Sequence, residues 1–162
     1  MTRETVLMRD LICLYHPEFV SSSDMRGCGL RRPDLFNVER LVEESLAAVG
    51  GYEFVDAEGY DFSDYSDSKT TSVNLKTRRA EIGNCETKIG ALRITAYNPH
   101  RDRLDYFYVP KRDMNSVRRP CYGNNSHKER IVFNWNHNWD HYNSFDDFRV
   151  PSFVDLAQAR DD

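Results

Sequence analysis

A short acidic segment, residues 59–73 (GYDFSDYSDSKTTSV), holds the residues whose types and spacing are best suited to chemistry. Asp61, Asp64 and Asp67 lie within seven positions, and Lys69 follows two residues after the last of them. Carboxylates this close repel one another unless a cation lies among them, and Mg²⁺ is commonly held by one or two carboxylates together with a phosphate. The segment therefore predicts a magnesium site formed by Asp61, Asp64 and Asp67.

Lys69 extends this prediction from metal binding to catalysis. Side chains two positions apart on a strand point to the same face, so a strand carrying Asp67 and Lys69 places the ammonium group beside the metal ligand. There a lysine can orient or deprotonate a water molecule and stabilise the charge that develops on a phosphate during hydrolysis. We therefore expect Asp61, Asp64, Asp67 and Lys69 to be the catalytic residues.

The same residues carry a resemblance to a known superfamily. An acid at Asp61 or Asp64, followed by Asp67-Ser68-Lys69 at the start of a strand, resembles the acidic pair and D/E-x-K element of the PD-(D/E)xK nucleases, which include many restriction and homing endonucleases. The resemblance implies that the first acid and Asp67 bind Mg²⁺ and that Lys69 is catalytic. Asp56, Asp61 and Asp64 all stay candidates for the first acid.

Positive charge is concentrated in the second half of the chain. Residues 69–130 hold 14 Lys and Arg against 6 Asp and Glu, whereas the rest of the chain holds 8 against 20. A protein that holds a divalent cation beside a polyanion needs such an arrangement, so we expect double-stranded DNA as the partner. The expected DNA contacts, with 113–129 as the recognition loop, are Arg78, Arg79, Arg101, Arg103, Lys111, Arg112, Arg118 and Arg119.

Hydrophobic periodicity predicts the elements that must position these residues. Apolar residues at helical spacing predict helices at 4–15 and 33–49, and Ser152 followed by Asp155 predicts a capped terminal helix at 153–160. The sequence predicts strands at 52–56, 69–75, 91–97, 104–109 and 131–133. We expect one α/β domain over 1–162 with a mixed, mostly antiparallel sheet flanked by helices, the first four strands forming that sheet. Similarity to the PD-(D/E)xK nucleases implies a restriction-endonuclease-like core.

The predicted helix at 33–49 carries acidic residues ahead of the proposed metal site. Glu39, Glu43 and Glu44 lie on it, and in some PD-(D/E)xK nucleases a glutamate of this helix lies near the metal. Acidic residues on a helix more often form a solvated face, and we expect that role here.

Composition and length limit the biological setting. No apolar run is long enough to cross a membrane and the N-terminal residues lack the features of a signal peptide, which predicts a cytoplasmic protein. The resemblance to restriction and homing endonucleases implies a bacterial or phage-like setting. The four cysteines contain no CxxC pair, so we expect free thiols. A chain this short that cuts both strands of DNA needs one active site per protomer, which predicts a twofold homodimer.

Three alternatives stay open. A non-enzymatic nucleic-acid-binding or regulatory protein would use the acidic loop to contact a basic partner. A small RNA-binding protein would use Arg93, Tyr97, Tyr106 and Tyr108 as stacking groups. A second metal site could involve His137, Asp140 and His141, where the two histidines have the i, i+4 spacing of helical ligands.

Overall fold

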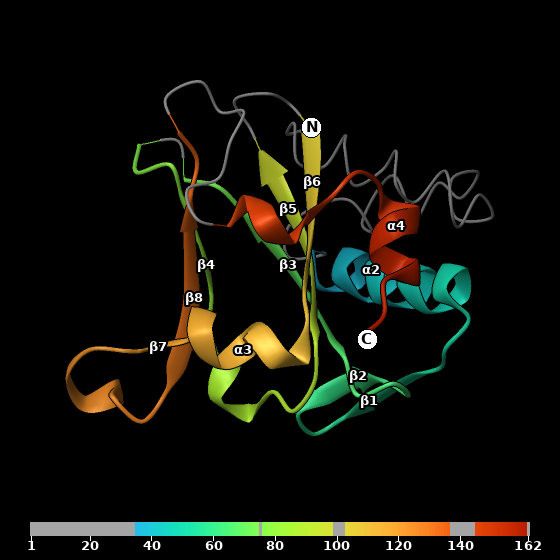
Figure 1. The fold of residues 1–162 in the computed structure, drawn as a ribbon, viewed down its shortest axis with the longest axis horizontal. Coiled ribbons are helices and arrows are strands. Elements are labelled where there is room, and N and C mark those ends of the chain that lie inside the picture. Colours follow the sequence, from blue (N-terminus) through green and yellow to red (C-terminus); the bar gives the residue numbers. More distant parts are fainter. Residues whose placement is uncertain (1–34, 75, 99–102, 137–144, 162) are drawn as a thin grey trace.

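The computed structural model describes residues 35–74, 76–98, 103–136 and 145–161 (Figure 1). The predicted helix at 4–15, the expected DNA contact Arg101 and the group His137, Asp140 and His141 lie outside the described residues. The described chain is an α/β protein with mixed sheets and three α-helices, which confirms the predicted class.

The main sheet has four strands in the order β3-β5-β6-β9. These are β3 (Asp67–Ser72), β5 (Leu92–Asn98), β6 (Arg103–Val109) and β9 (Arg149–Val150). β3 runs parallel to β5, whereas β6 is antiparallel to both of its neighbours. The predicted strands at 91–97 and 104–109 are therefore confirmed as an antiparallel pair, and the strand predicted at 69–75 begins two residues earlier, at Asp67.

A separate hairpin precedes the main sheet. β1 (Phe54–Ala57) pairs with β2 (Tyr60–Phe62), and Gly59 adopts a φ of 88° in the turn between them. The prediction that 52–56 belongs to the main sheet was wrong, because the acidic segment supplies a short partner strand of its own. This hairpin leads directly into β3.

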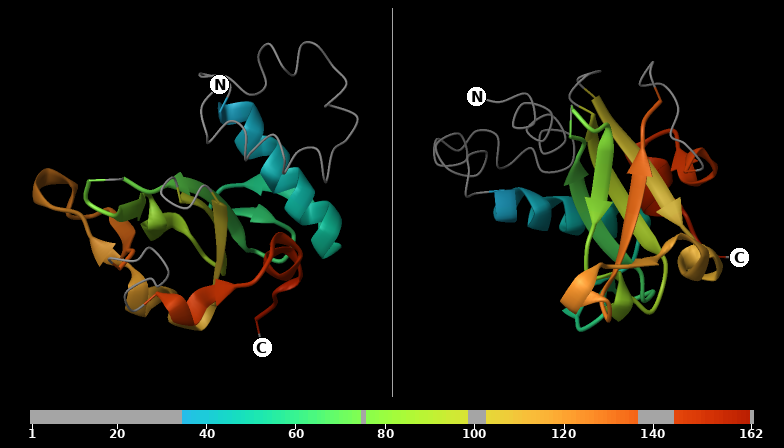
Figure 2. Two further views of the ribbon diagram at one scale, coloured as in Figure 1. Left: turned by 90° about the horizontal axis from the view of Figure 1, so that it is seen from above. Right: turned by 90° about the vertical axis from the view of Figure 1, so that its left-hand side faces the viewer.

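A second sheet packs on one face of the main sheet. It contains β4 (Arg79–Ile82), β8 (Glu129–Asn134) and β7 (Arg119–Pro120), in the order β4-β8-β7. Its residues Ile82, Ile131 and Phe133 share a buried cluster with Ile94 and Phe107 of the main sheet. The predicted strand at 131–133 is therefore confirmed, as part of this second layer (Figure 2).

Two helices pack on the other face. α2 (Leu35–Gly50) and α4 (Phe153–Gln158) bury Val42, Leu46 and Leu156 in one cluster with Tyr108 of β6. Because side chains alternate along a strand, Phe107 and Tyr108 contribute to opposite cores. The predicted cap of the terminal helix is confirmed, since Ser152 Oγ accepts a hydrogen bond from the backbone N–H of Asp155 at 3.1 Å.

The segment 113–129 is more regular than the sequence predicted. It contains most of α3 (Lys111–Val117), then β7 and the 3₁₀ helix η4 (Gly123–Asn125). Met114 is buried and anchors α3 to the core, which explains why this stretch is not a simple loop. Two further 3₁₀ helices are η3 (Cys85–Thr87) and η5 (Asp146–Phe148). Among the described residues, no helix is both long and apolar enough to cross a membrane.

Candidate active site

A tight turn between β2 and β3 brings the acidic residues together. The backbone N–H groups of Asp61 and Phe62 both donate to the carbonyl oxygen of Ser66, at 3.0 and 3.1 Å, and Tyr65 takes a positive φ of 69°. This reversal places Asp61 opposite the start of β3. The short spacing from Asp61 to Asp67 is therefore enough to join two neighbouring strands.

Asp61 contacts the start of β3 through its side chain. Its Oδ2 accepts a hydrogen bond from the backbone N–H of Ser68 at 2.9 Å, and its carboxyl group is hydrogen-bonded to that of Asp67. Burial and this hydrogen bond raise the pKa of Asp61 to about 6, against the lowering effect of the Ser68 N–H. The Asp61 carboxyl group thus holds its proton more tightly than usual at the position where a metal was predicted.

Asp67 is almost completely buried, at 2% exposure. Its backbone N–H donates to the carbonyl of Ala91 at 2.9 Å, which fixes the start of β3 against the chain entering β5. Its Oδ2 forms an ion pair with Lys88, whose Nζ lies 2.8 Å away. The angles of this contact fall outside hydrogen-bond geometry, so the buried oxygen has no hydrogen-bond partner. A buried carboxylate oxygen of this kind is suited to a cation.

Lys69 lies two residues along β3 from Asp67 and therefore on the same face of the strand. Its side chain is half-buried, and its charge acts on Glu39 and on the thiol of Cys85. The structure thus brings together three of the four predicted catalytic residues, Asp61, Asp67 and Lys69.

Two glutamates of α2 lie within electrostatic reach of this group and are half-buried, whereas the sequence predicted a solvated face. Glu39 and Glu43 are half-buried, and burial raises the pKa of both. For Glu43 the pKa rises to about 8, because burial is reinforced by the negative charges of Asp61, Glu39, Asp56 and Asp67. Glu44 does lie on the exposed face, where it pairs with Arg40 at 3.2 Å.

Asp64 has a different environment from Asp61 and Asp67. Its Oδ1 accepts hydrogen bonds from the backbone N–H and hydroxyl of Ser66, and its Oδ2 pairs with Arg93 Nη2 at 2.9 Å. Burial alone would raise its pKa, but the bonds from Ser66 and the charge of Arg93 lower it below the usual value. Both oxygens are engaged in structural contacts, so the structure does not support Asp64 as a metal ligand.

Asp56 is also an unsuitable first acid. It adopts a positive φ of 47°, its side chain is 64% exposed, and its nearest basic group is Arg40 at 4.0 Å. Of the three candidates left open by the sequence, the structure favours Asp61.

Those predicted DNA contacts that the structure describes lie at separate places in the fold. Lys111 and Arg112 begin α3, directly after Val109, which is in register with Leu92 and through it with Asp67. Two strand spacings, about 10 Å, therefore separate Val109 from Asp67 across the sheet. Arg78 and Arg79 follow the other end of β3, about 17 Å along the strand from Asp67. Of these two pairs, Lys111 and Arg112 therefore lie closer to Asp67 in the fold than Arg78 and Arg79 do.

Three other predicted contacts lie at different places in the fold. Arg118 is largely buried, donates to the carbonyl of Cys85 at 3.0 Å and lies 3.7 Å from Glu129, so its role is structural. Arg119 is exposed on β7, and Arg103 begins β6. Two of the stacking groups of the RNA-binding alternative are buried, since Arg93 is fully buried and Tyr108 is 8% exposed.

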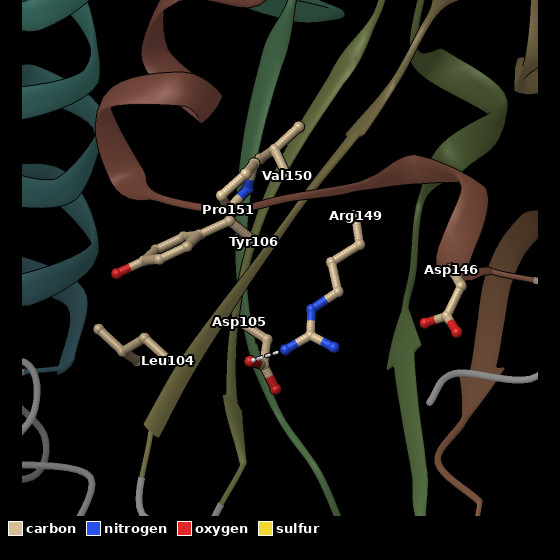
Figure 3. Close-up of a pocket in the computed structure, with 7 residues that line it drawn as sticks. All are labelled: Leu104, Asp105, Tyr106, Asp146, Arg149, Val150 and Pro151. Carbon is tan, nitrogen blue, oxygen red and sulfur yellow. Dashed lines mark hydrogen bonds and ion pairs between the residues drawn. The ribbon is translucent and has the colours of Figure 1, made fainter. Parts of the chain in front are cut away.

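The clearest surface pocket lies elsewhere, at the β6-β9 edge of the main sheet (Figure 3). Its volume is about 400 Å³, and an ion pair between Asp105 and Arg149, 3.0 Å long, lies on its wall. The pocket and the acidic group are at opposite edges of the sheet, because β3 is the other edge strand.

The acidic group fits a hard cation that keeps most of its water. Within the described ranges, no three carboxylate, imidazole or thiolate side chains already converge as a complete set of ligands. Asp61 and Asp67 offer only oxygen donors, and Mg²⁺ is typically held by one or two carboxylates, with water and phosphate completing its shell. A scan against protein-family models and a search among curated proteins both found no match, so the function must be argued from this geometry.

Proposed function

We propose that the protein is a Mg²⁺-dependent endonuclease that hydrolyses phosphodiester bonds in double-stranded DNA. The observation that carries this proposal is the hydrogen-bonded pair of Asp61 and Asp67, with the ammonium of Lys88 at 2.8 Å from Asp67 and with Lys69 on the same face of β3. Two carboxylates and two lysines at one strand edge provide both the cation ligands and the positive charge that phosphodiester hydrolysis requires.

Each residue has a distinct role in this proposal. Asp61 and Asp67 would hold Mg²⁺ through their carboxylate oxygens; the bound cation polarises the phosphate and lowers the pKa of water. Lys69 orients the attacking water and stabilises negative charge on the phosphate. Glu43, a half-buried acid whose pKa is raised in part by the charge of Asp61, would accept a hydrogen bond from water held by the cation.

The order of elements supports the resemblance to the PD-(D/E)xK nucleases. A helix, α2, is followed by a hairpin whose second strand carries Asp61 and then by the strand with Asp67 and Lys69. That strand is parallel to β5 within a mixed sheet. We therefore propose a restriction-endonuclease-like core, with Lys111 and Arg112 contacting DNA phosphates next to the site and a homodimer cutting both strands.

A plasmid cleavage assay tests this function. The protein should nick or linearise plasmid DNA with Mg²⁺ and should be inactive with a chelator. Asp67→Asn should abolish cleavage and Ca²⁺ binding, whereas Lys69→Ala should keep Ca²⁺ binding and lower the cleavage rate by about two orders of magnitude or more. Glu58→Gln, which changes an exposed acid in the turn between β1 and β2, is the matched control and should behave like the parent.

Two results would overturn the proposal. The parent protein could fail to cut DNA under all divalent cations tested, or the Asp67 and Lys69 variants could cut as well as the parent. In either case a binding or regulatory protein with an acidic partner-binding loop becomes the better interpretation.

A further inference from the structure

Lys88 reaches the acidic group from a part of the chain that the D-x-K motif does not include. It follows the 3₁₀ helix η3, and its backbone N–H donates to the carbonyl of Cys85 at 3.2 Å. Its ammonium lies 2.8 Å from Asp67 Oδ2, with side-chain exposures of 11% for Lys88 and 3% for Asp67. The ion pair is therefore largely removed from water, unlike an exposed pair such as Arg40 with Glu44.

The backbone around Lys88 is held close to the acidic turn. A Cβ placed on Gly90 would come within 2.2 Å of the carbonyl oxygen of Tyr65, so this close approach requires glycine. The next residue, Ala91, accepts the hydrogen bond from Asp67 N–H. The loop 88–91 and the turn 63–66 thus pack directly on each other, and the position of the Lys88 ammonium can change through its side chain with the backbone fixed.

The position of this ammonium conflicts with metal binding. Asp67 Oδ2 is the buried oxygen without a hydrogen-bond partner, and it is the oxygen that Lys88 contacts. A monovalent ammonium at 2.8 Å occupies the space that a cation bound to the same oxygen would need. Two positive charges so close in a partly buried site repel each other strongly.

We propose that Lys88 is the resident counter-ion of Asp67, and that a divalent cation binds this site by displacing its ammonium group. The inference rests on the proposed metal-dependent function of the same site. It assigns the two lysines different roles: Lys69 acts on the substrate, whereas Lys88 keeps Asp67 neutralised until the metal binds. Lys88 is thus a competitor of the metal, and removing it strengthens metal binding.

Calcium binding in the absence of DNA tests this assignment. Full-length parent, Lys88→Met, Lys69→Met and Lys76→Met proteins are titrated with Ca²⁺ by calorimetry; Lys76 is an exposed lysine in the turn after β3 and serves as the matched control. Lys88→Met should bind Ca²⁺ about tenfold more tightly than the Lys76→Met control. The Lys69→Met protein should show a much smaller gain, and Lys88→Arg should bind like the parent because it keeps the charge.

Thermal melting gives a second readout that does not depend on activity. Without divalent cations, Lys88→Met should melt at least about 5 °C below the parent, because it leaves a buried carboxylate without its counter-ion. Millimolar Ca²⁺ should restore most of this loss. If Lys88→Met does not fold without Ca²⁺, refolding in Ca²⁺ should recover it, and failure to fold in both conditions would overturn the inference.

The outcomes separate this inference from the proposed function. If the parent binds Ca²⁺, Asp67→Asn does not, and Lys88→Met binds no more tightly than Lys76→Met, the counter-ion role is wrong while the metal site stands. If the parent binds no divalent cation, the proposed function fails and the counter-ion role fails with it.

Discussion

Replacing Asp64 by asparagine distinguishes a structural carboxylate from a metal ligand. Arg93, its partner, is fully buried and donates to four acceptors: Ser66 Oγ at 3.2 Å, the carbonyls of Leu156 and Ala157 at 2.5 and 3.3 Å, and Asp64 Oδ2 at 2.9 Å. Its guanidinium also lies 4.7 Å from the ring centroid of Tyr52. Asp64 is the acidic group that neutralises this buried cation.

The expected cost follows from the burial of the two partners. Removing one partner of a buried ion pair costs about 3 to 5 kcal/mol, and a hydrogen bond to a charged group contributes about 1.5 to 3 kcal/mol. The Asp64 side chain is 27% exposed, and asparagine keeps one oxygen as an acceptor, so we expect the lower end. A loss of about 2 kcal/mol in a chain of this size lowers the Tm by roughly 4 to 8 °C.

Thermal melting and Ca²⁺ titration of Asp64→Asn, with Glu58→Gln as control, measure the two roles separately. The lowered pKa of Asp64 means that its contribution is present at neutral pH and is lost as the pH falls below its usual value of 3.8. The Tm difference from the parent should therefore shrink in acid. A variant that melts like the parent at neutral pH but no longer binds Ca²⁺ would refute the structural role and make Asp64 a metal ligand.

Three further predictions concern the acidic group, the DNA surface and assembly. Burial raises the pKa of Asp61 to about 6 and that of Glu43 to about 8, so the folded protein binds their protons more tightly than the unfolded chain does. Without divalent cations, the Tm should therefore fall as the pH rises from the ordinary carboxyl range toward these values, and a Tm that does not change with pH would contradict the raised pKa values. Changing both Lys111 and Arg112 to glutamine should weaken DNA binding in Ca²⁺ and reduce its salt dependence, whereas Arg79→Gln should have little effect. Fluorescence anisotropy measures the affinity, and an equal loss of affinity in the two variants would count against the proposed position of the DNA. Light scattering should detect a dimer at micromolar concentration, with or without DNA, and monomer in both conditions would argue against paired active sites.

The main sheet could be predicted from the sequence because its strands are long enough to show a pattern. The strands at 92–98 and 103–109 have seven residues each, and Leu92, Ile94 and Ala96 alternate with Arg93 and Thr95. The short strands carry no such signal: β2 has three residues, and β4 has four within a charged stretch. Their partners are set by tertiary packing, which single-sequence patterns do not record.

The candidate site was predictable where it depends on local spacing. Asp67 and Lys69 share a face because they are two residues apart on a strand, and this follows from the sequence. Whether Asp61 or Asp64 belongs to the site with Asp67 depends on Arg93, which lies 29 residues beyond Asp64 and binds the Asp64 carboxylate. The contact of Lys88 with Asp67 has the same origin, since the parallel pairing of β3 with β5 brings residue 88 back to the start of β3. Neither of these long-range contacts, Arg93 with Asp64 or Lys88 with Asp67, can be recognised from a pattern in the sequence.

The acids crowded at the start of β3 are compatible with a folded protein, because protons and a lysine ammonium balance their negative charge when no metal is bound. The pKa of Asp61 is raised to about 6 and that of Glu43 to about 8, so both acids favour their neutral forms, and Lys88 supplies an ammonium to Asp67. A divalent cation that binds here must therefore release protons and move Lys88. Metal affinity should depend on pH for this reason, and a DNA phosphate that attracts the Lys88 ammonium should increase metal affinity, because the two ligands then relieve the same repulsion. In the proposed mechanism, metal and substrate thus bind cooperatively, and the acidic group stays neutralised until both are present.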